Sequence, residues 1–278
     1  MGVVSAEHYL GLVALGTAVG CYGTLIGAGG GFVLMPVLLL LYPEQSANVL
    51  TCISLAVVFF NALSGSEAYA LLKRIDYRSG LMFSAATIPG AILGALNTSY
   101  VPRRLFDLIF AVLLLAAAAF LGWQPSKEKI NRKSFGAERH RVTRQLVDAH
   151  GITYEYNFNW LLGMTISIIV GYVSSFLGIG GGIIHVPALS YFLNFPIHIA
   201  TATSHFILAI MALTGTVVHI LTGTFAHGVH RTVALAIGVV LGAQIGARLS
   251  EKVRGRWIIR ALAMALGIVG LRILFVAW

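Results

Sequence analysis

The chain has 278 residues, of which 58% are hydrophobic and only 10% are charged. About a quarter of the residues in a soluble domain are charged, so this composition excludes a soluble domain, and the hydrophobic content excludes a disordered chain. The net charge of +9 does not indicate a nucleic-acid partner, because seven of the 19 basic residues lie in one polar stretch, Gln124 to Asn157. Most of the others lie at the ends of apolar runs, which is typical of a membrane protein.

Apolar runs of membrane-spanning length, which is about 20 residues, follow one another along the chain. The first run has no Lys or Arg before it, so it lacks the n-region of a cleaved signal peptide and we expect it to be mature structure. The first set of runs covers Tyr9–Gly27, Val49–Leu72, Ser79–Asn97 and Leu105–Trp123. The second set covers Trp160–Gly178, Ile197–Leu221, Val229–Leu249 and Trp257–Val276.

Both sets contain the same landmarks. In each set the first run ends in a glycine cluster, and a shorter apolar piece follows, at 32–42 and at 183–195. Residues recur at offsets of 150 to 152 positions, and the pairs include Val19/Val170, Gly27/Gly178, Gly30/Gly181, Pro36/Pro187, Thr51/Thr201, Ser54/Ser204, Gly65/Gly215, Gly90/Gly242 and Gly94/Gly246. This repetition predicts two membrane repeats, residues 1–123 and 158–278, joined by a basic linker at 124–157.

The distribution of basic residues favours one topology. If each glycine break folds the first run back as a re-entrant helical hairpin, three transmembrane helices follow it and the two repeats are inverted. With the linker on the cytoplasmic side, this arrangement places fourteen basic residues inside and three outside, namely Arg103, Arg104 and Arg231. Four single crossings per half would place eleven inside and six outside. We therefore predict an all-α polytopic membrane protein with inverted repeats, a cytoplasmic linker and both termini on the exterior side.

The two glycine clusters predict a binding site. Breaks inside membrane segments leave backbone N–H and C=O groups unpaired, so they are tolerated where they line a cavity. Each break stands before a short helix, whose N-terminal N–H groups and dipole favour an anion. Interrupted segments at matching positions of two repeats also indicate a transporter's substrate site. The expected amide donors are Gly29, Gly30, Gly31, Gly180, Gly181 and Gly182. In the alternative interpretation the glycines only permit close helix packing, as we expect for the GxxxG pairs Gly90/Gly94 and Gly242/Gly246.

Small polar side chains share one face of the expected helix at 197–221 and of its counterpart at 49–72. Hydroxyl groups and backbone amides can hold an oxyanion without a buried full charge. We therefore expect Thr51, Ser54, Thr201 and Ser204 to contact the substrate. In the structural alternative, such hydroxyls bond the backbone of their own helix.

His185, His205 and His219 are the candidates for proton coupling, because an ionisable side chain at membrane depth indicates function. His185 and His205 match Leu34 and Leu55 in the first half, so the histidines occur in only one repeat. We expect His205 also to neutralise or sense the anion. In the alternative interpretation each histidine is neutral and bonded to a backbone carbonyl. The two cysteines, Cys21 and Cys52, lie in apolar runs and indicate neither a disulfide nor a metal site, and no cofactor is expected.

The paired G-x-G-G-G breaks, each followed five residues later by Pro36 or Pro187, resemble those of the TauE/SafE sulfite exporter family, also called the toluenesulfonate uptake permease family. The Thr- and Ser-bearing helices that reach Gly65 and Gly215, and the G-A-x-x-G-A segments, are similar to that family too. The resemblance covers both halves and omits the linker. It implies a permease for small sulfur-containing anions such as sulfite or organosulfonates, located in the cell inner membrane.

We therefore expect an exporter that works by alternating access and is driven by protons or by the membrane potential. Its expected partners are a small anion and the lipid bilayer, and a homodimer is compatible with the sequence. An anion channel and a permease for another small organic anion stay open as alternatives. The absence of GxSxG and HExxH motifs argues against an enzyme. A sensor or scaffold built on the linker is a further alternative. In the simpler interpretation, the linker is a solvated basic loop near anionic lipid.

Overall fold

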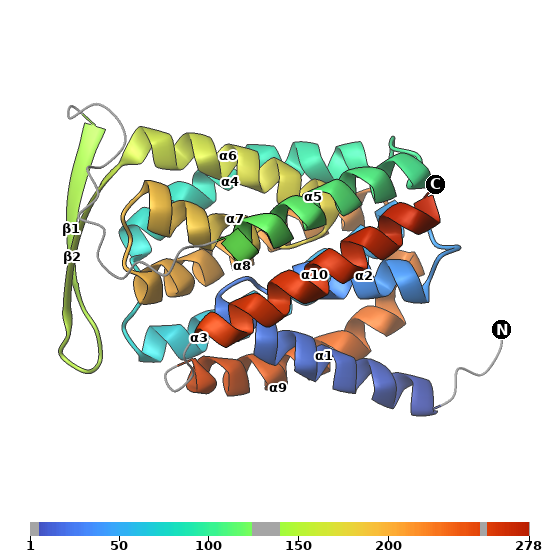
Figure 1. The fold of residues 1–278 in the computed structure, drawn as a ribbon, viewed down its shortest axis with the longest axis horizontal. Coiled ribbons are helices and arrows are strands. Elements are labelled where there is room, and N and C mark those ends of the chain that lie inside the picture. Colours follow the sequence, from blue (N-terminus) through green and yellow to red (C-terminus); the bar gives the residue numbers. More distant parts are fainter. Residues whose placement is uncertain (1–5, 124–139, 251–254, 278) are drawn as a thin grey trace.

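The computed structural model describes residues 6–123, 140–250 and 255–277. Its helices lie roughly along one long axis, and a two-stranded β-hairpin stands at one end of the bundle (Figure 1). The first half contains α1 (Ala6–Ile26), α2 (Gly31–Leu41), α3 (Ala47–Leu71), α4 (Tyr77–Thr98) and α5 (Arg103–Trp123). The second half contains β1 (Arg141–Val147), β2 (Thr153–Asn159), α6 (Trp160–Leu177), α7 (Gly182–Pro187), the π-helix η2 (Ala188–Phe192), α8 (Ile197–Leu221), the 3₁₀ turn η3 (Thr224–His227), α9 (Val229–Leu249) and α10 (Gly255–Ala277).

The apolar runs of the sequence become the long helices, and the bounds predicted for α8 and α9 coincide with those in the structure. Within the described part of the chain, six helices are long and apolar enough to cross a membrane: α1, α3, α4, α6, α8 and α9. These helices satisfy their backbone groups internally, as hydrocarbon requires. The chain is therefore a predominantly helical, multi-pass membrane protein.

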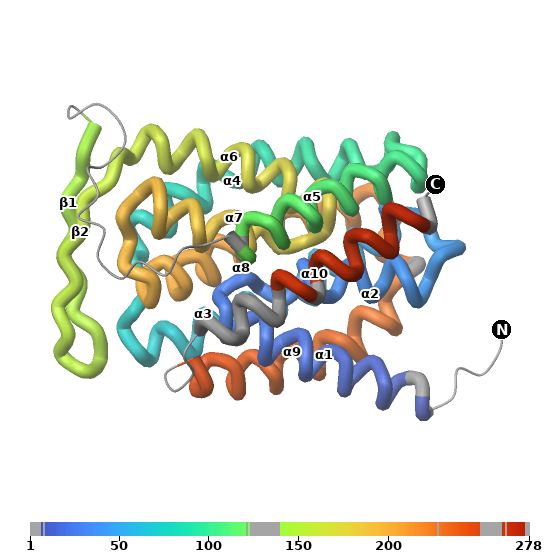
Figure 2. Tube along the Cα trace, in the orientation of Figure 1, coloured from blue at the N-terminus to red at the C-terminus, as the bar shows by residue number. Residues whose placement is uncertain are grey.

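The chain reverses direction at each glycine break. Figure 2 traces α1 from one end of the molecule to its interior and α2 back toward the same end. In the second half α6 begins directly after β2, and Leu189 and Leu193, after the break, pack in one cluster with Tyr156 of β2. The segment from α6 to η2 therefore begins and ends beside the β-hairpin.

Contacts between the halves are reciprocal. α1 packs on α9 as α6 packs on α4, and α3 packs on α9 as α8 packs on α4. α3 contacts α8, and α5 contacts α10. The GxxxG pairs make the close approaches expected of them, because a Cβ atom at Gly90 or Gly242 would overlap the backbone of Ile168 or Thr17. Exchanging the two halves thus reproduces the same set of helix contacts.

The sequence did not predict the β-hairpin, which occupies the second part of the basic linker. β1 and β2 are antiparallel, with Arg141 opposite Asn159 and Val147 opposite Thr153. Tyr156 and Phe158 point inward and join a buried cluster with Phe195. The linker is therefore packed on the helices from residue 140 onward, while residues 124–139 lie outside the described residues.

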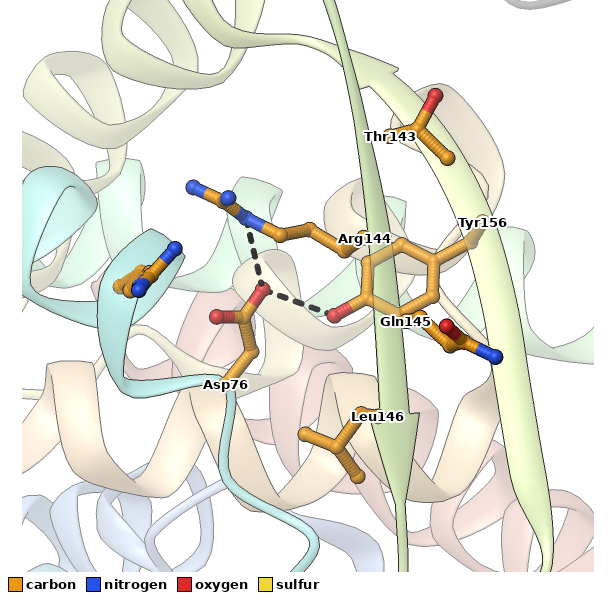
Figure 3. Close-up of a pocket in the computed structure, with 7 residues that line it drawn as sticks. Asp76, Thr143, Arg144, Gln145, Leu146 and Tyr156 are labelled. Atoms are coloured by element: carbon orange, nitrogen blue, oxygen red, sulfur yellow. Dashed lines mark hydrogen bonds and ion pairs between the residues drawn. The ribbon is translucent and has the colours of Figure 1, made fainter.

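Buried polar contacts fix the hairpin to the loop between α3 and α4. The Asp76 carboxylate accepts a hydrogen bond of 2.8 Å from the Tyr156 hydroxyl and lies 3.9 Å from the Arg144 guanidinium (Figure 3). Arg74 pairs with Asp148 at 3.5 Å. Desolvation raises the pKa of Asp148, but the backbone N–H groups of Ile152 and His150 and the charge of Arg74 outweigh it, so the pKa is lowered overall.

Candidate functional site

The two glycine breaks meet in the interior of the bundle. A Cβ atom at Gly31 would lie 2.6 Å from the carbonyl oxygen of Ile179, and one at Gly182 would overlap the backbone of Ala28. Each break also faces a threonine of the other half. A Cβ at Gly27 would lie 3.0 Å from the Cα of Thr201, and one at Gly178 would lie 3.0 Å from the Cα of Thr51. The structure therefore brings the predicted glycines and threonines of both halves together.

The breaks hold backbone geometry that side chains rarely adopt. Gly30 and Gly181 are the N-cap residues of α2 and α7, with φ of 76° and 61°. Because both caps are glycines, no N-cap side chain accepts a hydrogen bond from the first turn of either helix. Two of the predicted amide donors are engaged within the breaks, because Gly29 N–H donates to Gly23 and Gly182 N–H donates to Gly180. The caps themselves are thus the part of each break that resembles an anion-binding helix terminus.

The four predicted hydroxyl groups differ in their partners. Ser54 Oγ donates a 2.5 Å hydrogen bond to the carbonyl of Gly178, which ties α3 to the second break. Thr51 and Ser204 are buried, and within the described residues their hydroxyls have no hydrogen-bond partner. Thr201 is buried beside Gly27. Thr51 and Ser204 are therefore the hydroxyls that a substrate can reach without breaking an existing bond.

The three histidines have different surroundings. His205 is fully buried, and its ring lies near the carbonyls of Gly27, in the first break, and of Thr201. The geometry nevertheless leaves both ring nitrogens without a hydrogen bond to any described residue. His185 follows the second break, and its Nε2 lies 3.2 Å from the hydroxyl of Ser167. His219 is buried about four helical turns beyond His205, on nearly the same face of α8.

The structure adds Thr24 and Asn61, which the sequence analysis missed. Thr24, near the end of α1, donates from its hydroxyl to Asn61 Oδ1 at 3.1 Å. The Tyr69 hydroxyl donates to the carbonyl of Thr24 at 2.8 Å, and the Tyr69 and His205 rings lie 5.5 Å apart. A Cβ at Gly65 would lie 2.6 Å from the His205 ring. We call Thr24, Asn61, Gly65, Tyr69 and His205 the polar cluster.

A signal for the polar cluster exists in the sequence. Asn61, Gly65 and Tyr69 are spaced by four residues and therefore share one helical face. An asparagine in an otherwise apolar run is a polar group that must find a partner in the membrane. Its partner Thr24 belongs to another helix, so the spacing alone does not identify the pair.

Comparison with known proteins agrees with these observations. A family model described as sulfite exporter TauE/SafE matches residues 12–273. A probable membrane transporter protein of Bacillus subtilis, YunE, is 31% identical over 95% of this chain and 96% of its own length. A probable membrane transporter protein of Methanocaldococcus jannaschii is 21% identical over 94% of this chain and 93% of its own length. Another from Bacillus subtilis, YdhB, is 25% identical over 90% of this chain and 94% of its own length. No solved structure shows significant similarity. With its glycine breaks, its helices and nearly its whole length matched, this chain belongs to the TauE/SafE sulfite exporter family.

Proposed function

We propose that this protein exports small sulfur-containing anions, such as sulfite or organosulfonates, across the cell inner membrane by alternating access. The family and its relatives, which are named as probable membrane transporters, support transport. The observation that carries the proposal is the meeting of two glycine-capped helix N-termini from opposite halves in the bundle interior. Such termini present N–H groups and a positive dipole end to an anion.

The proposed substrate contacts combine backbone and side-chain donors. The amides of Gly30, Gly31, Gly180 and Gly181 contribute first, whereas Gly29 and Gly182 would have to exchange their bonds to Gly23 and Gly180 for the substrate. Thr51, Ser54, Thr201 and Ser204 surround them, and two of these hydroxyls have no partner within the described residues. His205 supplies an imidazole that can take up one proton. The uncharged donors can bind an oxyanion and release it again, which a carrier must do.

The proposed cycle uses inverted repeats. The reciprocal contacts between the halves support a two-fold relation, and the reversal of the chain at each break supports re-entrant hairpins. In this proposal the two hairpins rock against the α3–α8 pair and open the breaks to one side at a time. The β-hairpin faces the cytoplasm, and the beginning of α1 and the end of α10 face the exterior.

Two driving forces fit an anion site of this kind. A negative interior pushes an anion outward with about 2.3 kcal/mol per charge for each 100 mV. A proton carried by a histidine would couple flux to a pH gradient, with His205 as the first candidate and His185 and His219 as the others.

Uptake of labelled sulfite into proteoliposomes, at imposed voltages and pH gradients, tests the proposal. We expect saturable flux that organosulfonates reduce by competition and that a counter-substrate inside the vesicle stimulates. Flux that never saturates would favour an anion channel on the same breaks. The absence of flux for every sulfur oxyanion and sulfonate would contradict the proposed substrate class.

A further inference from the structure

The polar cluster has a counterpart in the second repeat that is largely apolar. The positions that match Thr24, Asn61, Gly65, Tyr69 and His205 are Ser175, Met211, Gly215, His219 and Leu55. This second set also comes together, because a Cβ at Gly215 would lie 2.9 Å from Leu55 and 3.3 Å from the Ser175 hydroxyl. The repeat thus builds the same cluster twice, but the amide of Asn61 and the imidazole of His205 in the first are replaced by the apolar Met211 and Leu55 in the second.

The polar cluster contains a buried amide donor that has no hydrogen-bond partner among the described residues. Asn61 is fully buried, and its Oδ1 accepts from Thr24, yet its Nδ2 has no hydrogen-bond partner within the described residues. Tyr69 is held by the carbonyl of Thr24, which also accepts from Gly27 N–H at the start of the break. An unpaired amide nitrogen in a buried site loses free energy unless a ligand or water accepts from it. The buried Nδ2 of Asn61 is therefore a donor that an acceptor bound within the polar cluster can satisfy.

The charges around the polar cluster limit the charge of that acceptor. Within the described residues, the buried charged side chains are Arg74, Asp76 and Asp148. All three lie at the hairpin end, where Arg74 pairs with Asp148, and Asp76 accepts from Ser79 and Tyr156. Among the described residues, the titratable side chain whose contact with His205 is seen is Tyr69 of α3. The charge of Arg74 reaches Tyr69 but is already paired with Asp148, so among the described residues a protonated His205 is the buried cation that can balance a bound anion.

The electrostatic cost of desolvating an ion rises with the square of its charge, so a dianion needs far more compensation than a monoanion. One imidazolium and neutral donors can balance one negative charge. We propose that the polar cluster is the selectivity site of the transporter, that it binds a single monovalent oxyanion with Asn61 Nδ2 as a donor, and that it rejects dianions. This inference rests on the proposed function and narrows its substrates to hydrogensulfite and organosulfonates that carry a single negative charge.

The test compares methanesulfonate, a permanent monoanion, with sulfate, a dianion, on the reconstituted protein. We expect methanesulfonate to be carried, and sulfate to be carried at least tenfold more slowly. Equilibrium binding of methanesulfonate to the solubilised protein should weaken at least tenfold in Asn61→Leu. The matched control is Met211→Leu at the corresponding position of the second repeat, which should change binding less than twofold.

The outcomes separate this inference from the function on which it rests. The selectivity site would be overturned if sulfate flux equalled that of methanesulfonate, or if Asn61→Leu bound methanesulfonate within twofold of the wild type. Neither result would contradict the proposed transport. A wild type that binds methanesulfonate through Asn61 but moves no sulfur anion would overturn the proposed transport and keep the site. The sulfate comparison uses no variant, so it stays decisive if Asn61→Leu fails to fold.

Discussion

Ser54 and Ser204 occupy matching positions in the two repeats, but among the described residues only the Ser54 hydroxyl has a hydrogen-bond partner, the carbonyl of Gly178. Replacing Ser54 by Ala leaves that buried carbonyl unpaired, which reduces the free energy of unfolding by about 1–3 kcal/mol. Ser204→Ala removes no bond, so it should weaken anion binding and leave stability unchanged. Thermal unfolding in detergent, with and without methanesulfonate, measures both effects. Equal destabilisation by the two substitutions would contradict this assignment.

His205 lies next to the first break, near the carbonyl of Gly27, and neither of its ring nitrogens has a well-formed hydrogen bond to a described residue. We expect flux of a permanently charged sulfonate to vary with pH in the wild type and to lose that dependence in His205→Ala. His230, which is exposed at the start of α9, provides the control, and His230→Ala should keep the wild-type profile. A pH profile that survives in His205→Ala would move proton coupling to His185 or His219.

At single positions, sequence reasoning succeeded where the repeat supplies the information. The offset of about 150 residues selected the glycines and threonines that meet across the molecule. It could not select Thr24 and Asn61, because their contact joins two helices of one repeat and Met211, the counterpart of Asn61, cannot form the same hydrogen bond with Ser175. Departures from a repeat therefore become visible only after the structure shows which helices touch.

Among the elements, the β-hairpin gives a prediction on pH. The pKa of Asp148 is lower in the folded protein than in an unfolded chain, so its contribution to docking is present above the ordinary value of about 4 and is lost as pH falls below it. Hydrogen exchange at the amides of His150 and Ile152 should therefore speed up between neutral pH and pH of about 3.5, after correction for the intrinsic rate. Asp148→Asn should remove this dependence, whereas Glu155→Gln, an exposed change on β2, should keep it. Exchange that does not change with pH in the wild type would contradict the prediction.

Helices were predictable from composition and the hairpin was not. Long apolar runs specify membrane helices by themselves, and the bounds of α8 and α9 follow directly. The hairpin does carry a period-two signal, with Tyr154, Tyr156 and Phe158 on alternate residues. That pattern was not used because the linker is basic, and a basic segment between membrane halves is usually a solvated loop. Its aromatic face is buried only because α4 and the segment before α8 cover it.

For the whole molecule, the inverted repeats predict which ends face which side. The hairpin contacts the loop that precedes α4, and α4 has 22 residues, which span about 33 Å, so Tyr100 lies at the opposite end from Thr143. In intact cells an impermeant maleimide should label Tyr100→Cys and not Thr143→Cys, in a chain whose Cys21 and Cys52 are replaced by Ala. Labelling of both positions, or of Thr143→Cys alone, would contradict the topology.

The central claim is that an anion passes through the place where the two breaks meet, and the most direct measurement is sulfite flux in variants of the breaks. A side chain at Gly30 would strain a left-handed residue and lie 2.9 Å from the Val19 carbonyl, and one at Gly181 would lie 2.6 Å from the Ser174 hydroxyl. Gly11 of α1 has open space around it and is the control. We predict that Gly30→Leu and Gly181→Leu abolish voltage-driven sulfite flux in proteoliposomes while the protein still inserts, and that Gly11→Leu retains it. Wild-type flux in both break variants would contradict the claim.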